Sequence, residues 1–439
     1  MRINKKRFTS LVIGAVGLST FAQQILTVNN AVEITLENNY DIKVVEKDIE
    51  VAKNNASIYN SGYLPTASIN SGASYNNGNS SVESQTGEVS EVSGAESTSI
   101  NASVGISYVL FDGFNRKYTY EQLKGSLSLA ELQNRQVIEN SLLDLYAAYY
   151  EVARLTENKN NQKQTLEISK QRLLRTEYAA NYGQSTKLDV LNAQVDINND
   201  SITFLDTQRQ LANAKRNLNV VLGREANITD FNVETEVVYI LGLNIDELMN
   251  DALENNTILL QTNKGIELSN YDVKISQSGW MPTVTANGSY AWLKNNNDQN
   301  SFVASQQFDG INAGITLGWN IFDGGRTKTR VQNSKIAVES QEIAKEQYVQ
   351  QLKRDVYNAW EFYQNALFTF QVQETNVTTN QRNFERTSEQ YKLGQVTSID
   401  FRLAQVNLLN AERDLSRSKY DAKIAEFQLL FLAGLLIGN

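Results

Sequence analysis

The sequence predicts an α+β protein built from two tandem repeats, each with a long helical hairpin and two short strands. The only two prolines of the 439-residue chain, Pro65 and Pro282, stand in matching phrases, Ser-Gly-Tyr-Leu-Pro-Thr and Ser-Gly-Trp-Met-Pro-Thr. Each proline follows an amphipathic helical stretch and precedes a run of alternating residues, where a fixed φ and a missing amide donor are tolerated. A long stretch without proline then follows in both halves.

A constant offset relates the two halves. Adding 211 carries the tripeptide Phe-Asp-Gly at 111–113 onto the same tripeptide at 322–324, whereas the prolines are 217 apart, so a loop between them has shortened in the second half. Internal similarity over about 200 residues exceeds the usual solenoid periods. We therefore predict a first repeat over residues 23–223, a linker over 224–244 and a second repeat over 245–439.

The N-terminus carries an export signal. Four cations, Arg2, Lys5, Lys6 and Arg7, precede an apolar run that ends in Phe21-Ala22. This is the pattern of a secretory signal peptide over residues 1–22, and it fits better than an ordinary buried helix because the charges are clustered. Without these cations the formal charge falls from −9 to −13, so the mature chain is acidic and we expect no nucleic-acid partner.

Composition argues against an enzyme. The chain has no cysteine and no histidine, which removes disulfides, Cys or His nucleophiles, the Ser-His-Asp triad and the usual zinc sites. Asp144 and Asp355 correspond across the repeats, yet neither has an evident acid/base partner, and the chain has no glycine-rich phosphate loop. We expect no catalytic residue, no cofactor and no metal site.

Four segments alternate with a period of two, near residues 65–76, 102–111, 282–292 and 312–322. These lengths suit tilted barrel strands, and no segment after the signal has the roughly 18 apolar residues of a membrane helix. In each strand one face is apolar and the other is small or hydroxylic. The apolar faces carry Ala67, Ile69, Ala73 and Tyr75; Val104, Ile106, Tyr108 and Leu110; Val284, Ala286, Tyr290 and Trp292; and Ile315, Leu317, Trp319 and Ile321.

A soluble, half-buried sheet would show the same alternation. The export signal, the strand aromatics and the polar segments near residues 76–101 and 294–310, which we predict to be loops, favour membrane strands. Pro65 and Pro282 then mark helix-to-strand junctions, and the strand exits have turn chemistry. The exit residues are Asp112, Gly113, Asp323 and Gly324.

Four strands cannot close a barrel, because about eight are the minimum. Either the chain oligomerises or these strands do not span a membrane. Three copies would supply twelve strands.

The helical stretches are long. Residues 326–390 would extend roughly 95 Å at about 1.5 Å per residue. Gly183 and Gly394 can adopt the left-handed conformation that ends a helix, so each repeat is predicted to form a hairpin with its tip there. Asp189 and Asp400 follow these glycines by six residues, where a carboxylate near a helix N-terminus is favourable. A coiled-coil seam is visible in the second repeat at Val349, Leu352, Val356, Ala359, Tyr363, Ala366 and Phe370.

The duplicated order of proline junction, Phe-Asp-Gly exit and Gly-x-x-x-x-x-Asp tip resembles the TolC family of outer-membrane efflux proteins. The resemblance covers nearly all of the mature chain. It implies a homotrimer with one twelve-stranded barrel in the outer membrane of a Gram-negative bacterium and an α-helical barrel in the periplasm. It also implies a channel-tunnel that exports substrates in tripartite efflux or type I secretion, together with a periplasmic adaptor and an inner-membrane pump.

The resemblance also implies roles for residues at the tips. Gly183 and Gly394 match the tip glycines, where the adaptor docks. Asp400 matches a position whose carboxylates ring the entrance, and Asp189 and Tyr391 match positions whose contacts hold the tips shut. The chain departs from the pattern where Leu403 replaces a second ring aspartate and Val396 replaces an arginine, while the nearby Arg402 offers another charge.

A periplasmic scaffold or adaptor without its own pore is the alternative. Coiled-coil hairpins, short strands and a signal peptide would also suit such a protein. Adaptors, however, usually have one hairpin in the middle of a palindromic chain, and this chain is a tandem repeat. We therefore favour the channel.

Overall fold

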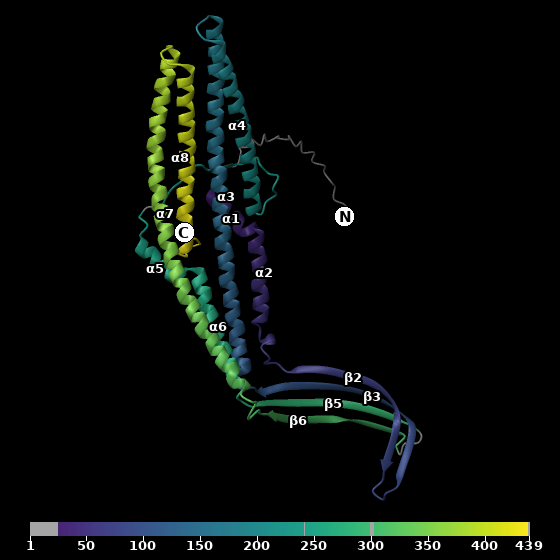
Figure 1. The fold of residues 1–439 in the computed structure, drawn as a ribbon. Coiled ribbons are helices and arrows are strands. Elements are labelled where there is room, and N and C mark those ends of the chain that lie inside the picture. The colour runs from purple at the N-terminus through teal and green to yellow at the C-terminus, as the bar shows by residue number, and fades with distance from the viewer. Residues whose placement is uncertain (1–24, 241, 299–302, 438–439) are drawn as a thin grey trace, which may run out of the picture. The chain divides into compact units, whose positions relative to one another are not determined.

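The computed structural model describes residues 25–240, 242–298 and 303–437, so the predicted signal peptide lies outside the described residues. Helices dominate, and the strands β2, β3, β5 and β6 form one sheet (Figure 1). The order is β1 (Ile25–Leu26), α1 (Val28–Asn38), α2 (Tyr40–Asn55), β2 (Thr66–Glu83), β3 (Val89–Phe111), α3 (Asn115–Asn181), α4 (Lys187–Val221), β4 (Asn232–Val233), α5 (Ile245–Asn255), α6 (Thr257–Ser278), β5 (Thr283–Asn297), β6 (Ser305–Gly318), α7 (Arg326–Lys392) and α8 (Ser398–Leu432).

The chain divides into two compact units. The hairpin unit comprises the described residues up to Asn39, with Leu142–Tyr239 and Gln364–Ala425. The sheet unit comprises Tyr40–Ser141, Ile240–Tyr363 and the described residues from Glu426 onward. Each unit is described by itself below.

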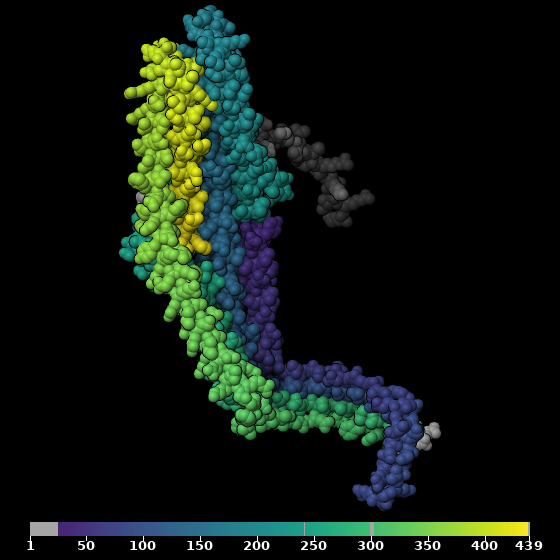
Figure 2. Space-filling model, in the orientation of Figure 1, coloured from purple at the N-terminus to yellow at the C-terminus, as the bar shows by residue number. Residues whose placement is uncertain are grey.

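The sheet is antiparallel with the order β2-β3-β5-β6, and its register supports the predicted division of faces. One row across the four strands is apolar and the adjacent row, which faces the other way, is small and polar. The apolar row is Ile69, Val104, Tyr290 and Ile311, and the polar row is Ser68, Gly105, Ser289 and Asn312. Within the sheet unit, no described helix covers the strands on the face seen in Figure 2.

The strands are longer than the alternation predicted. β2 continues to Glu83 and β3 starts at Val89, so the predicted loop near residues 76–101 is wrong. The predicted loop near 294–310 is shortened in the same way, because β5 ends at Asn297 and β6 starts at Ser305. Backbone hydrogen bonds hold a ladder together whatever the side chains are, so a change to polar residues does not end a strand.

A bulge corrects one face assignment. Val109 pairs with Thr285, but it is Phe111 that pairs with Val284, so Leu110 is the extra residue of β3. The bulge shifts the phase of the strand. Phe111 therefore takes the place on the apolar face that the alternation gave to Leu110. β6 in turn ends at Gly318, four residues before the predicted end near 322.

The two aspartates predicted at strand exits cap the following helices, although β6 ends at Gly318, before Asp323. Asp112 Oδ2 accepts hydrogen bonds from the backbone N and the Nε of Arg116, each at 3.0 Å. Asp323 Oδ2 accepts from the backbone N of Thr327 at 2.8 Å. Gly113 has φ +66°, and a Cβ there would lie 2.6 Å from the Cβ of Met281, so the turn into α3 requires glycine.

The long helices come in matched lengths. α3 and α7 each contain 67 residues, and α4 and α8 each contain 35. In the sheet unit, part of the predicted seam of α7 is buried: Leu352 and Val356 pack with Ala252 and Leu259 of α5 and α6. Among the described residues, no helix combines the length and the apolar character that crossing a membrane requires.

In the hairpin unit, side chains from the helices hold the linker between α4 and α5. The Lys215 ammonium donates to the carbonyls of Thr229 and Phe231, and burial lowers the pKa of this lysine. Lys423 Nζ donates to the carbonyl of Val238 at 2.7 Å. Lys419 of α8 donates to Glu157 of α3 as well as to the linker, so α8 and α3 are joined at this level.

Candidate functional site at the hairpin tips

Each long helix ends at its tip in the same hydrogen-bonded turn. Gly183 has φ +73°, its N–H donates to the carbonyl of Ala180 at 3.1 Å, and the Gln184 N–H donates to the carbonyl of Ala179 at 2.8 Å. This pair of bonds with a left-handed glycine is a Schellman motif. Gly394, also at φ +73°, repeats it at the end of α7. Both glycines singled out from the sequence thus reverse the chain.

Asp189 and Asp400 lie in equivalent capping contacts at the starts of α4 and α8. Asp189 Oδ2 accepts from the backbone N of Thr186 at 2.9 Å and from its Oγ1 at 2.6 Å, while the Asp189 N–H donates back to Oγ1 at 3.2 Å. Asp400 and Thr397 make the same three bonds at 3.0, 2.6 and 3.2 Å. The hydrogen bond from the threonine hydroxyl, Thr186 or Thr397, is the main reason why the pKa of each carboxyl is lowered.

Tyr391 joins the two hairpins. Its hydroxyl lies 3.3 Å from Oγ1 of Thr176 on α3, and its ring centroid lies 4.9 Å from that of Phe401 on α8. The guanidinium of Arg175 lies over the same ring, 5.4 Å from the centroid. Among the described residues, no hydrogen bond links Asp189, Asp400 and Tyr391 to one another.

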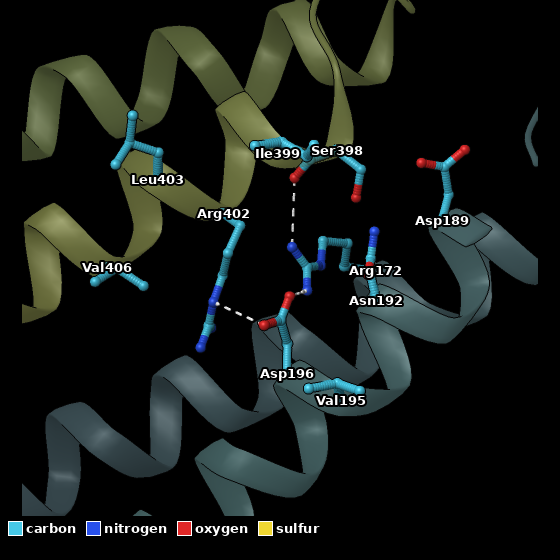
Figure 3. Close-up of a pocket in the computed structure, with 10 residues that line it drawn as sticks. All are labelled: Arg172, Asp189, Asn192, Val195, Asp196, Ser398, Ile399, Arg402, Leu403 and Val406. Atoms are coloured by element: carbon cyan, nitrogen blue, oxygen red, sulfur yellow. Dashed lines mark hydrogen bonds and ion pairs between the residues drawn. The ribbon is translucent and has the colours of Figure 1, made fainter.

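A cavity of about 390 Å³ lies between α4 and α8 near the tips (Figure 3). The side chain of Arg172 from α3, only 2% exposed, reaches it and pairs with Asp196. Arg172 Nη1 also donates to the carbonyl of Ser398 at 3.4 Å, and its Nε has no hydrogen-bond partner among the described residues. The polar residues Asp189, Asn192 and Arg402 also line the cavity. Its apolar lining consists of Val195, Ile399, Leu403 and Val406.

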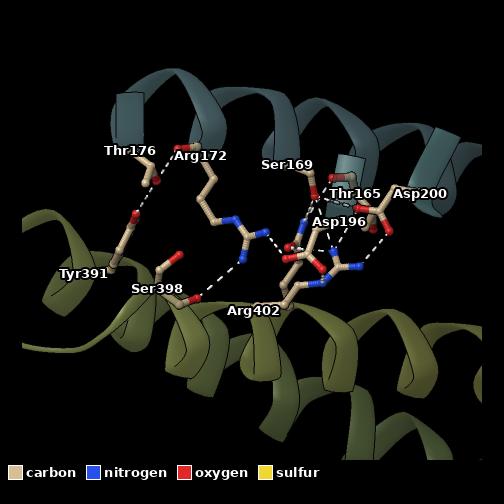
Figure 4. A network of polar contacts seen from close by, with 10 residues as sticks. Thr165, Ser169, Arg172, Thr176, Asp196, Asp200, Tyr391, Ser398 and Arg402 are labelled. Atoms are coloured by element: carbon tan, nitrogen blue, oxygen red, sulfur yellow. Dashed lines mark hydrogen bonds and ion pairs between the residues drawn. The ribbon is translucent and has the colours of Figure 1, made fainter. Parts of the chain in front are cut away.

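Beside this cavity, a buried ion pair joins α4 to α8 (Figure 4). Arg402 donates from Nη2 to Asp200 Oδ1 and from Nη1 to Asp200 Oδ2, both at 2.8 Å. Ser169 of α3 donates to the same carboxylate at 2.6 Å, and Gln405 donates to Ser169 at 3.1 Å. Three helices therefore share one polar network, which we call the Arg402 network: Ser169, Arg172, Asp196, Asp200, Arg402 and Gln405.

Most of this network was not predicted from the sequence, in which only the charge of Arg402 stood out. A signal was present in the spacing. Asp196 and Asp200 lie four residues apart on α4, and Ser169, Arg172 and Thr176 follow the 3-4 spacing of a helix-packing seam on α3. Polar residues at positions where a seam usually carries apolar ones indicate a buried hydrogen-bonded contact.

The comparisons with known proteins agree with this architecture. The family model described as "Outer membrane efflux protein" matches residues 31–224 and 248–435. The outer membrane protein TolC of Vibrio cholerae is 20% identical over 434 residues, which cover 98% of this chain and 94% of that protein. The outer membrane efflux protein BepC of Brucella suis is 21% identical over 334 residues, 75% of this chain and 71% of BepC.

Among solved structures, the Campylobacter jejuni CmeC outer membrane channel superposes with a TM-score of 0.75 at 16% identity, covering 99% of this chain and 94% of that one. This likeness shows the fold. The family is one of outer-membrane channel proteins rather than enzymes, and the comparisons do not favour the pore-free scaffold. The chain therefore belongs to the outer membrane efflux protein family, and it is an outer-membrane channel protein of efflux or type I secretion.

Proposed function

We propose that three copies of this chain form one export channel, with twelve strands closed into an outer-membrane barrel and the helices forming a periplasmic tunnel. The observation that carries this proposal is the pair of open sheet edges. β2 and β6 are the outer strands of the four-stranded sheet. An open edge at membrane depth leaves backbone groups without partners, and pairing β2 with β6 of the next copy removes every edge.

The apolar band of the sheet supports a membrane position. On β5 it runs from Val284 to Trp292, a rise of eight residues or about 26 Å along the strand at about 3.3 Å per residue. Outer-membrane barrels have an apolar band of about 25 Å. Beyond Trp292 the same face continues with Lys294 and Asn296, so the strands extend past the band into water.

An apolar seam on α4 supports the contact between copies in the helical part. Its members follow the 3-4-7 spacing of a coiled coil, yet each side chain is between 55% and 66% exposed. An exposed heptad seam of this length marks an interface. The seam consists of Leu188, Leu191, Val195, Ile202 and Leu205. On α7, Phe368 and Val372 offer an exposed apolar surface for the neighbouring copy.

The tips are the proposed gate. Asp400 of three copies would form an acidic ring at the entrance, and Asp189 and Tyr391 would contribute to tip contacts. We add the Arg402 network, which fastens α8 to α3 and α4 inside one copy. The exposed side chains beside the tip glycines, Tyr182 and Leu393, are the proposed docking surface for a periplasmic adaptor that couples the channel to an inner-membrane pump.

Oligomeric state and conductance test the channel directly. Detergent-extracted protein should run as a heat-dissociable trimer and form pores in a planar bilayer. Leu191→Asp places a charge in the seam and should dissociate the trimer at concentrations where the wild type stays assembled. Thr203→Asp, an equal charge on the same helix away from the seam, is the control. A stable monomer that forms no pores would refute the proposal.

A further inference from the structure

Phe114 has an unusual backbone conformation. Its φ is +66°, and no other non-glycine residue in the described ranges has a positive φ. A bulky side chain is disfavoured in the left-handed region. The residue 211 positions further on is Gly325, with φ +88°. The same turn therefore exists in the second half with the residue that adopts it without strain, and the phenylalanine needs a separate explanation.

The ring of Phe114 extends the apolar face of the sheet. It is 54% exposed and lies edge-on to the ring of Phe111, with the centroids 5.5 Å apart. The bulge in β3 places Phe111 in the apolar row with Val284 and Leu317. Phe114 thus continues the apolar band beyond the last strand residue, at the junction with α3.

Other exposed apolar side chains lie at the same junction between strands and helices. Phe322, the counterpart of Phe111, is 86% exposed. Trp319 donates its indole N–H to the carbonyl of Trp280 at 3.1 Å, and both rings remain about half exposed. Aromatic side chains with a polar end are typical of the boundary between acyl chains and headgroups. The remaining members are Leu64, Met281 and Ile321.

Cations at the start of α7 point independently to phosphate. Arg326, Lys328 and Arg330 are all exposed, and the first turn of α7 contains no acidic residue, so the capping carboxylate of Asp323 before the helix, which attracts Arg326, faces three cations. The helix macrodipole disfavours cations at an N-terminus. Anionic lipid headgroups beside the helix would compensate, because basic side chains at a membrane surface are attracted to lipid phosphates.

We propose that this junction is a lipid anchor in the periplasmic leaflet of the outer membrane. The Phe114 ring lies among acyl chains, and the three cations of the first turns of α7 contact phosphates of glycerophospholipids. Burial of the ring in lipid offsets the strained backbone, which explains why phenylalanine stands where the second half has glycine. The anchor rests on the proposed membrane position of the sheet.

Spin labelling tests the anchor. Because the sequence contains no cysteine, the label attaches only at the cysteine that is introduced. The full chain is reconstituted in phosphatidylcholine and phosphatidylglycerol vesicles with a nitroxide on Phe114→Cys, on Ile106→Cys of the apolar sheet face, or on Tyr357→Cys of α7. Labels at 114 and 106 should be relaxed more by oxygen than by a water-soluble nickel chelate, and the label at 357 should show the reverse. Phe322→Cys provides a second probe of the junction if Phe114→Cys fails to assemble.

The outcomes separate the two proposals. A lipid signal at 106 with a water signal at 114 and 322 overturns the anchor and leaves the membrane position of the sheet intact. A water signal at 106 as well refutes the proposed channel. Shielding of 114 and 322 from both relaxing agents would place them against protein, such as another copy, and also overturns the anchor.

A charge-matched pair of variants tests the phosphate contacts. Replacing Arg326, Lys328 and Arg330 with glutamine should reduce the phosphatidylglycerol retained after detergent extraction at least twofold, as measured by mass spectrometry of the intact complex. The control replaces Lys335, Arg382 and Arg386, exposed cations further along the same helix, with glutamine. Equal retention in the two variants would overturn the phosphate contact.

Discussion

Arg402 of α8 and Asp200 of α4 form an ion pair with two hydrogen bonds near the tips. Both side chains are mostly buried, and the hydroxyl of Ser169 donates a third hydrogen bond to the Asp200 carboxylate. Arg402→Met leaves the Asp200 carboxylate buried without its partner, which should cost about 3–5 kcal/mol of local stability. Adding Asp200→Asn to Arg402→Met should recover part of that loss. Thermal unfolding of both variants in detergent measures the difference.

The expected consequence for function is a more open channel, because α8 loses its ion pair with α4 near the tips, while the contact of Lys419 with Glu157 further along the helices remains. Lys392→Met is the control, since the Lys392–Glu389 pair is exposed and should contribute about 0–1 kcal/mol. If Arg402→Met and Lys392→Met leave stability and pore conductance equally unchanged, the Arg402 network has no part in closing the tips.

Phe114 offers a second test at the residue scale. Replacement by alanine or by glycine removes the ring and its contact with Phe111 equally. Only glycine relieves the positive φ, so Phe114→Gly should be more stable than Phe114→Ala by roughly 1–2 kcal/mol. Comparing the two unfolding temperatures in detergent measures this difference. If the two variants unfold at the same temperature, residue 114 carries no backbone strain.

At the scale of elements, the capping contacts predict a pH dependence. The hydrogen bond from Thr397 lowers the pKa of Asp400 below its ordinary value of 3.8, and Thr186 does the same for Asp189. A carboxyl with a depressed pKa in the folded state contributes stability above the unfolded value, and this is lost as the pH falls through the folded value. The starts of α4 and α8 should therefore fray below about pH 4 and not between pH 5 and 7.

Amide hydrogen exchange of the tip peptides, corrected for intrinsic rates at each pH, measures this fraying. Thr397→Val removes the hydroxyl, so α8 should lose protection already at neutral pH while α4 keeps its own cap. Protection of α8 that does not differ between Thr397→Val and the wild type would contradict the capping role.

Local sequence patterns predicted an element correctly where the residue type itself fixes the backbone conformation. Gly183 and Gly394 mark the chain reversals because only a left-handed residue closes that turn. Alternation located the apolar faces but not the strand ends, since Asn76, Asn77, Ser80 and Ser81 stay paired although their side chains are polar. The bulge at Leu110 and the burial of Arg172 depend on contacts across helices and strands, which spacing within one segment does not specify.

At the scale of the whole molecule, the open sheet edges and the exposed α4 seam point to the same assembly. The free edge of β2 needs a strand to pair with, and the α4 seam needs an apolar surface to pack against. The chain supplies candidates for both, in the free edge of β6 and in the exposed apolar residues of α7. The proposed trimer would supply both contacts with one symmetry operation. The duplication inferred from the sequence fits this arrangement, because α3 and α7, like α4 and α8, have equal lengths and can alternate around one axis.

The proposed entrance ring is a property that would exist only in the assembly. Three Asp400 carboxylates around one axis repel one another unless a cation lies between them, so a multivalent cation added on the tip side should block the pore. Asp400→Asn keeps a side-chain oxygen for the cap with Thr397 but removes the charge, and it should abolish the block and weaken cation selectivity in a planar bilayer. Glu389→Gln removes one exposed carboxylate near the same tip and should leave the block in place. Cation block that survives in Asp400→Asn would show that the charges at the entrance come from other residues, and the gate would then have to be sought along the wall of the tunnel.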